Sequence, residues 1–226
     1  SEGFLPITVI KELPGSNEVS NSSVNFRLAD QRSKILGQLL REAWINQDQK
    51  RRKEFNNWCG QQFWLEDHVA FIELRRQYQD LPWWKWPKPF ASHNACSLFL
   101  WKRDNQDKLM EHRLVQWHLD RQWKSLKTLA RELGVLLFGD LPFYVSRDSA
   151  DVWSSRSLFS IDPEGELESQ SGVPPDYFSE TGQLWGTPVY RWDVHRITHF
   201  NWWRRRFARH LEQVDLLRLD HFRALE

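Results

Sequence analysis

Two short apolar runs, each ending in an aspartate, constrain the fold of this chain most strongly. One is LLFGD, which ends at Asp140, and the other is LLRLD, which ends at Asp220. Each run follows a stretch with apolar residues at helical spacing, over 107–133 and 199–213. The runs are too short for helices and are typical of buried strands. Helix then strand, repeated, is the pattern of a parallel sheet and indicates an α/β fold. The predicted strands are 134–145 and 214–222.

The residues before 107 show helical rather than strand patterns. Apolar side chains recur at helical spacing over 31–57 and 62–78. The segment PWWKWPKPF (82–90) cannot form a regular helix because its prolines lack amide donors and restrict the residues before them, so we predict a rigid aromatic loop. A lead-in rich in Ser, Asn and Glu comes first, with one short predicted strand at 7–10. The predicted parts are an irregular lead-in (1–30), a mostly helical insertion or subdomain (31–106) and the α/β part (107–226).

A long connection separates the two predicted strands from each other. Residues 140–198 hold five of the ten prolines and show little periodicity. A connection of this length in a compact domain is usually either functional or disordered. Its many aromatic residues argue against disorder, so we expect an ordered functional loop.

Tryptophan is the unusual feature of the composition, with 14 in 226 residues. Most tryptophans in proteins pack into cores, because their rings bury a large area. A second interpretation is a set of flat platforms, on which sugar rings or nucleic-acid bases can stack. Composition alone does not choose between these interpretations. The net charge of +1 gives no general basic field for nucleic acid or a membrane surface.

Several other function classes find no support in the sequence. Cys59 and Cys96 lack metal-type spacing and indicate a reduced compartment, so we predict a cytoplasmic protein, or one of the plastid stroma in a plant or alga. No apolar run approaches the length of a membrane helix. The aspartates Asp148, Asp151 and Asp162 match no Ca²⁺ loop, so we predict no required metal and no cofactor.

The two aspartates at the strand ends are the candidate chemical groups. In parallel α/β barrels the active site lies at the carboxyl ends of the strands. Such an aspartate could instead cap a helix or satisfy loop amides, and for Asp140 this alternative stays open. Asp220 is accompanied by Arg218, two residues earlier and therefore on the same strand face. A neighbouring arginine lowers the pKa of a carboxyl group and keeps it ionised, as covalent catalysis at a sugar carbon requires.

Three longer motifs carry a resemblance to a known family. RLDHF (218–222) is similar to the nucleophile strand of the α-amylase clan of glycosidases and transglycosidases. GDLPFYVSRDSADVW (139–153), GVPPDYFSETGQLWGTPVY (172–190) and RLDHFR (218–223) together resemble the 4-α-glucanotransferases of glycoside hydrolase family 77, also called amylomaltases or disproportionating enzymes. WLEDHVAF (64–71) and PWWKWP (82–87) fit this family less closely.

The resemblance implies a fold and a reaction. Members have a TIM-type (β/α)8 barrel with inserted subdomains and long loops after the strands. They cleave an α-1,4 bond of a glucan such as starch, glycogen or a maltodextrin, and transfer the glucan to the 4-hydroxyl of glucose or another glucan with retention of configuration. By the resemblance, Asp220 is the nucleophile and Arg218 orients it. The other implied roles, in sugar binding, fall on Asp140, His221, Gln183, Trp185, Tyr177 and Phe178.

The resemblance also sets limits on what this chain should do alone. Retaining mechanisms need a second carboxyl group as acid and base, roughly 5–5.5 Å from the nucleophile. In this family it lies on a later strand, so we expect it beyond Glu226 and expect the isolated chain to be inactive. The chain also begins at Ser1 rather than at a methionine, which favours either a processed chain or a piece of a larger protein.

Three competing functions stay open at this point. The first is an α-glucan hydrolase of the same clan, which the VPPDYF and GQLWG stretches disfavour. The second is a fragment that binds glucans without cleaving them. The third and weakest is nucleic-acid binding through the basic runs 50–53 and 204–206, which lie on separate predicted helices. The oligomeric state is not predicted.

Overall fold

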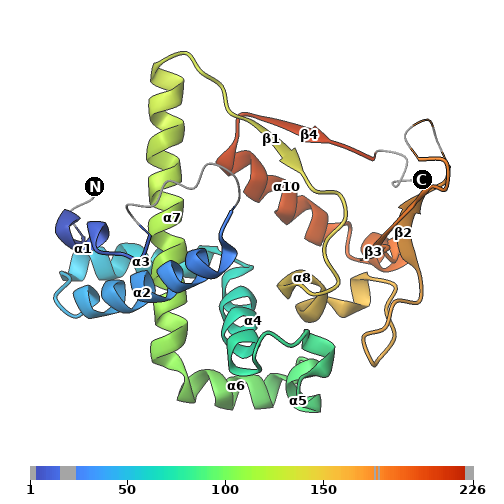
Figure 1. The fold of residues 1–226 in the computed structure, drawn as a ribbon, viewed down its shortest axis with the longest axis horizontal. Coiled ribbons are helices and arrows are strands. Elements are labelled where there is room, and N and C mark those ends of the chain that lie inside the picture. Colours follow the sequence, from blue (N-terminus) through green and yellow to red (C-terminus); the bar gives the residue numbers. More distant parts are fainter. Residues whose placement is uncertain (1–3, 16–23, 176, 178, 222–226) are drawn as a thin grey trace. The chain divides into compact units, whose positions relative to one another are not determined.

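The computed structural model describes residues 4–15, 24–175, 177 and 179–221 (Figure 1). Phe178, one of the predicted sugar-binding residues, lies outside the described residues. The chain divides into two compact units, Ser1–Glu73 with Trp101–Gln122 and Leu74–Leu100 with Trp123–Glu226. The division between sequence parts at 30/31 and 106/107 stays a prediction.

The first unit is helical. It contains α1 (Ile7–Lys11), α2 (Phe26–Trp44), α3 (Gln49–Gln61), most of α4 (Leu65–Gln77), the end of α6 (Ala95–Asp104) and the first part of α7 (Gln106–Glu132). The helices predicted over 62–78 and 107–133 are confirmed as α4 and α7.

Three sequence predictions in this unit are wrong. The segment predicted as a short strand at 7–10 lies in the helix α1. The helix α2 begins within the expected lead-in, because the Asn25 side chain accepts a hydrogen bond from the Leu28 amide at 3.0 Å. The single helix predicted over 31–57 is two helices, because Asp48 caps a new one by accepting from the Arg51 amide at 2.7 Å. Polar residues that resemble a loop in sequence are therefore helix caps here.

Tryptophans in this unit serve as packing residues. Trp44, Phe55 and Trp117 form a buried trio, with ring centroids 4.8 to 5.9 Å apart. Trp58 is buried as well, and its Nε1 donates to Asp120 Oδ2 at 2.9 Å. The packing interpretation of these tryptophans holds.

The second unit contains all the described strands (Figure 1). Besides the remaining parts of α4, α6 and α7, its elements are η1 (Trp83–Lys85), α5 (Lys88–Ala91), β1 (Phe138–Leu141), α8 (Ala150–Ser154), η2 (Arg156–Leu158), β2 (Gln170–Val173), β3 (Gln183–Pro188), α9 (Trp192–Ile197), α10 (Asn201–Gln213) and β4 (Leu216–Leu219). The helix predicted over 199–213 is confirmed as α10.

The two predicted strands pair as expected. β1 and β4 lie side by side and are parallel, with Phe138 opposite Leu216 and Asp140 opposite Arg218 (Figure 1). This confirms the α/β class and the parallel pairing. The prediction that the strands are long and fully buried is wrong: each has four residues, and Phe138 is 66% and Leu216 51% exposed. Among the described residues this sheet has only these two strands, so each strand has one edge that pairs with no other described strand.

Helix α7 anchors the turn between α10 and β4. Lys127 is buried, and its ammonium group donates to the carbonyls of Leu211, Glu212 and Val214 at 3.1, 3.0 and 2.8 Å. One turn earlier, Trp123 Nε1 donates to the Gln213 carbonyl at 2.7 Å. Asp215 follows Val214 directly before β4. Its carboxylate accepts a hydrogen bond from the Leu137 amide at 2.9 Å and so joins the starts of β1 and β4. These contacts set the register of the sheet.

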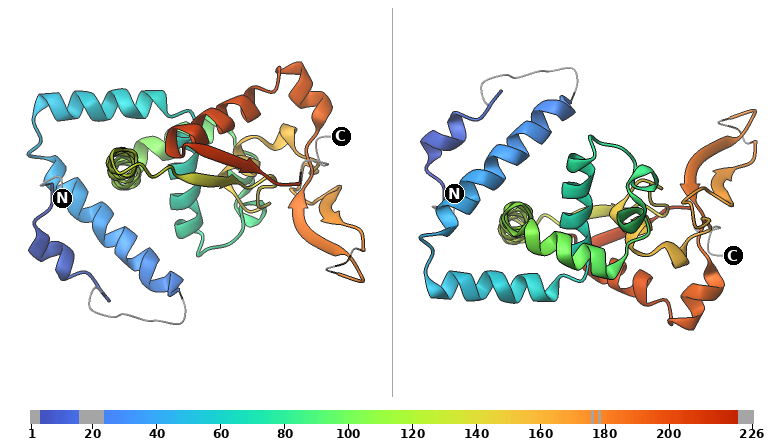
Figure 2. Two further views of the ribbon diagram at one scale, coloured as in Figure 1. Left: turned by 90° about the horizontal axis from the view of Figure 1, so that it is seen from above. Right: turned by 90° about the horizontal axis from the view of Figure 1, so that it is seen from below.

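The long connection between β1 and β4 is ordered by a hairpin and a tryptophan core. β2 and β3 form an antiparallel pair, and Figure 2 shows this hairpin near the carboxyl end of β4. Trp83 and Trp153 are fully buried, and their Nε1 atoms donate to the carbonyls of Arg147 and Phe90 at 2.7 and 2.8 Å. The segment 82–90 is less irregular than predicted, since it forms η1 and the start of α5, but it contains no helix longer than a turn.

Candidate active site

An arginine and an aspartate face each other across the parallel strands. Asp140 on β1 lies opposite Arg218 on β4. The guanidinium donates through Nε to Oδ1 at 3.2 Å and through Nη2 to Oδ2 at 2.5 Å, a bidentate pair. These hydrogen bonds lower the pKa of the Asp140 carboxyl, and the same carboxylate raises the pKa of Arg218. The pair keeps Asp140 ionised.

Asp220 shares the same arginine. Its Oδ2 lies 3.5 Å from Arg218 Nη2, so one guanidinium lies between two carboxylates. The sequence predicted the contact between Arg218 and Asp220, and the structure adds that the hydrogen bonds of Arg218 go to Asp140. The three side chains are 53 to 59% exposed, so the group is open to a ligand from solvent.

An aromatic group continues the cluster beyond β4. His221 has a left-handed backbone, with φ of 55°, and its ring centroid lies 4.8 Å from that of Trp185 on β3. Trp185 Nε1 donates to Gln183 Oε1 at 3.0 Å, which fixes the orientation of the indole. The structure therefore brings together five of the predicted site residues around β4 and a sixth, Gln183, through Trp185.

Tyr177, among the predicted site residues that the structure describes, is almost fully exposed rather than buried in this cluster. The Tyr177 side chain is 99% exposed to solvent. Phe178 lies outside the described residues. Their sugar-binding roles stay predictions.

Tyr144 joins this aromatic group, although it was not among the predicted site residues. Its ring lies 5.8 Å from that of Trp185 and is stacked on Tyr190 at 6.1 Å, with an interplanar angle of 14°. Burial raises the pKa of Tyr144, so the hydroxyl stays protonated and can donate or accept a hydrogen bond. Its position four residues after Asp140, in the stretch GDLPFYV, was the available signal.

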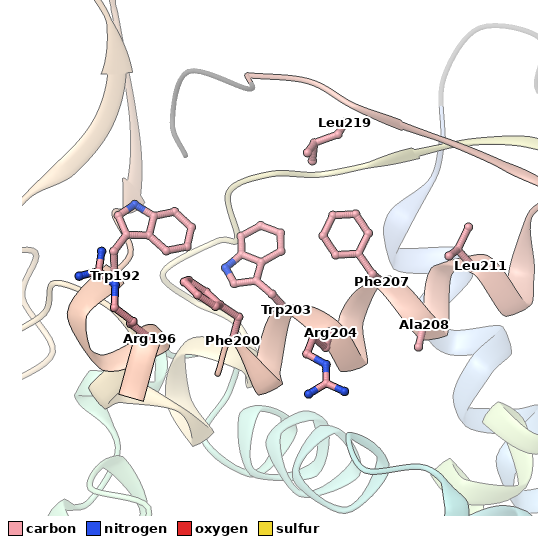
Figure 3. Close-up of a pocket in the computed structure, with 9 residues that line it drawn as sticks. All are labelled: Trp192, Arg196, Phe200, Trp203, Arg204, Phe207, Ala208, Leu211 and Leu219. Atoms are coloured by element: carbon pink, nitrogen blue, oxygen red, sulfur yellow. The ribbon is translucent and has the colours of Figure 1, made fainter. Parts of the chain in front are cut away.

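A separate hollow of about 700 Å³ lies on the opposite face of β4 (Figure 3). It runs along α9 and α10 and is lined mainly by aromatic and aliphatic residues, among them Trp192, Trp203 and Phe207. Leu219 points toward it (Figure 3). Side chains alternate along a strand, so the adjacent Arg218, which pairs with Asp220, belongs to the other face. The hollow and the carboxylate cluster are therefore distinct features.

The described residues form neither a metal cluster nor a membrane-spanning helix. Within them, no three His, Cys, Asp or Glu side chains gather in a way that could hold a metal ion. Over the same residues, no helix has the length and apolar character needed to cross a bilayer.

Comparison with known proteins identifies the family. A family model described as 4-alpha-glucanotransferase, glycoside hydrolase family 77, matches residues 11–226. The chain belongs to the 4-alpha-glucanotransferase family. The 4-alpha-glucanotransferase of Synechocystis sp. is 37% identical over 228 residues, covering all of this chain and 45% of that protein. The 4-alpha-glucanotransferase of Thermus thermophilus is 43% identical over 164 residues, covering 73% of this chain and 33% of that protein.

A solved structure of the 4-alpha-glucanotransferase type has the same fold over the matched part. The amylomaltase from Streptococcus agalactiae in complex with acarbose matches with a TM-score of 0.87 and 27% identity, over 98% of this chain and 44% of that one. The chain thus spans less than half the length of these members of the 4-alpha-glucanotransferase family. Its two-stranded parallel sheet corresponds to part of a larger fold.

Proposed function

We propose that the complete protein is a 4-α-glucanotransferase and that this chain is the part that carries its nucleophile. The observation that supports this most directly is one guanidinium between two carboxylates at the carboxyl ends of parallel strands. Family membership supports it independently. The proposed substrates are α-1,4-glucans, with glucose or a second glucan as acceptor.

In the proposed mechanism, the ionised Asp220 attacks the anomeric carbon of the sugar at the cleavage point. The leaving glucan takes a proton from a second carboxyl group, which we propose lies in the part of the protein that this chain does not cover. The 4-hydroxyl of an acceptor sugar then attacks the glucosyl–enzyme bond and returns its proton to that group. Two inversions at one carbon retain the configuration.

The remaining cluster would bind the sugar and limit the access of water. Arg218 orients Asp220, while Asp140 and His221 accept and donate hydrogen bonds to sugar hydroxyls. The half-buried Trp185, held by Gln183, presents an apolar face for a sugar ring. Transfer exceeds hydrolysis only if an acceptor sugar reaches the intermediate more effectively than water does.

Asp220→Asn in the complete protein tests the proposed nucleophile. We expect kcat for glucan transfer from maltotriose to fall by about a thousandfold or more, because an amide cannot form the covalent intermediate. Asp193→Asn, on the exposed side of α9, is the matched control and should keep the wild-type rate. Wild-type turnover with an unchanged rate in Asp220→Asn would exclude Asp220 as the nucleophile.

Product analysis separates the competing functions. A transferase should yield longer and shorter maltodextrins from maltotriose, and added glucose should raise the yield of short products. A hydrolase would release glucose and maltose regardless of added acceptor. A binding protein would retain maltodextrins without turnover.

We also propose how the chain fits into the whole protein. Residues 107–226 would form part of a TIM barrel, with the helices of 31–106 as an inserted subdomain. We propose a location in the cytoplasm, or in plastids for a plant protein. The relatives from rice and potato, which are described as chloroplastic or amyloplastic, support the plastid alternative.

A further inference from the structure

The loop after β1 joins two residues of the proposed sugar site. Asp140 lies in β1 just before the loop, and Tyr144 lies within the loop, three residues beyond the strand. Leu141 and Phe143 are buried, at 0% and 2% exposure, and fix the side-chain packing of the loop. The loop backbone is held by side chains that donate hydrogen bonds to the carbonyls of Pro142 and Phe143.

Arg206 on α10 provides most of these bonds. Its Nη2 donates to the Pro142 carbonyl at 2.6 Å, and its Nη1 approaches the Phe143 carbonyl and the Tyr190 hydroxyl at 3.4 Å each. The Tyr190 hydroxyl in turn donates to the Phe143 carbonyl at 2.5 Å. One guanidinium therefore connects α10 to two consecutive carbonyls of the loop.

The surroundings of Arg206 restrict its guanidinium. The group lies 5.1 Å from the ring centroid of Trp202 and 5.5 Å from that of Trp203. Burial raises the pKa of the nearby Asp151 carboxyl. The positive charge of Arg206 acts in the opposite direction but does not cancel the effect of burial, so the two groups interact. A guanidinium group is planar and permanently charged, so it can lie against aromatic rings and donate to two carbonyls at once. The lysine ammonium group is a compact point charge without this planar arrangement of donors.

The neighbouring basic residues differ from Arg206. The sequence suggested a basic run over 204–206, but Arg204 is exposed and is one of the residues that line the hollow along α10 (Figure 3). Arg206 instead donates to the Pro142 carbonyl of the loop. This makes Arg204 a matched control, since both residues lie on the same helix.

We propose that Arg206 is a positioning residue for the sugar site. Lys127 and Asp215 set the register at the start of the strands, whereas Arg206, by holding the carbonyls of Pro142 and Phe143, fixes the carboxyl end of β1. It thereby keeps the Asp140 carboxylate against Arg218 and Tyr144 against Trp185. The inference deepens the proposed function and rests on it for the role of the two positioned residues.

The first test uses the 226-residue chain and does not require activity. The side-chain carboxyl carbon of Asp140 is followed by ¹³C NMR through an acid titration and assigned with Asp140→Asn. In Arg206→Met, which keeps much of the apolar stem, we expect the pKa of Asp140 to rise toward its ordinary value, because β1 no longer holds the carboxylate against Arg218. Arg204→Met should leave the titration unchanged.

The second test uses the complete protein with maltotriose. We expect Arg206→Met to raise KM by about tenfold with a smaller change in kcat, the effect of losing well-placed hydrogen bonds to substrate. Arg206→Lys, which can restore one bond and is the safer variant for folding, should give an intermediate KM. Absence of transfer in the wild-type protein would refute the proposed function but leave the titration as the test of positioning. An unchanged Asp140 titration in Arg206→Met and Arg206→Lys, or an equal shift in Arg204→Met, would overturn the inference.

Discussion

Replacing Lys127 with methionine should weaken the connection between α10 and β4. The buried ammonium group donates three hydrogen bonds, at 2.8 to 3.1 Å, to carbonyls at the end of α10. A hydrogen bond to a charged group contributes about 1.5–3 kcal/mol, and a cation at a helix C-terminus adds up to about 2 kcal/mol. Methionine keeps the length and the apolar contacts of the stem but has no donor.

The expected loss is smaller than the sum of these contributions. Leu211 and Glu212 are exposed, so water can hydrate their carbonyls once the ammonium group is gone. The Val214 carbonyl is less accessible and loses more. We therefore expect Lys127→Met to lower the free energy of unfolding by about 2–4 kcal/mol, a large share of the 5–15 kcal/mol typical of a domain.

Urea unfolding and amide hydrogen exchange measure this effect. Exchange should accelerate at Asp215 and Leu216, whose amides donate to the Leu137 carbonyl at 2.8 and 3.1 Å and report on the start of the sheet. Lys124→Met is the matched control, because Lys124 is on the same helix but exposed, and it should change stability by no more than about 0.5 kcal/mol. Equal losses in the two variants, or unchanged exchange at Leu216, would refute the reasoning.

Three further predictions concern other parts of the chain. The amide of Leu137 and the nearby cations lower the pKa of Asp215. The ionised carboxylate therefore stabilises the folded protein above the unfolded pKa of about 4, and this contribution is lost as pH falls through the folded pKa. Asp215→Asn should flatten the acid side of a curve of stability against pH, measured from urea midpoints. Gly172→Ala should cost about 1–3 kcal/mol and speed amide exchange in the β2–β3 hairpin, because its Cβ would collide with the Gln183 carbonyl. Trp58→Phe should cost about 1–3 kcal/mol in thermal unfolding, since it removes the indole donor from the buried Asp120; no loss would show that this hydrogen bond is dispensable.

Local patterns in the sequence were sufficient for the helices α4, α7 and α10 and for the pairing of the two strands. The apolar spacing of α7 and α10 is a local property, and so is the short apolar run of each strand. Predictions were wrong where a polar residue could belong either to a loop or to the N-terminal cap of a helix. Asn25 and Asp48 resemble loop residues in composition, yet each begins a helix by accepting a backbone amide hydrogen bond.

By itself, the sequence determined that Arg218 and Asp220 share a strand face, because side chains alternate along any strand. Its motifs also indicated the family to which the chain belongs. Only the tertiary structure decided that Arg218 forms its hydrogen bonds with Asp140, since strand register depends on contacts between residues far apart in sequence, such as Lys127 with Val214 and Asp215 with Leu137. The same holds for Tyr144 and Arg206, whose places near the site follow from packing across the fold rather than from any local pattern.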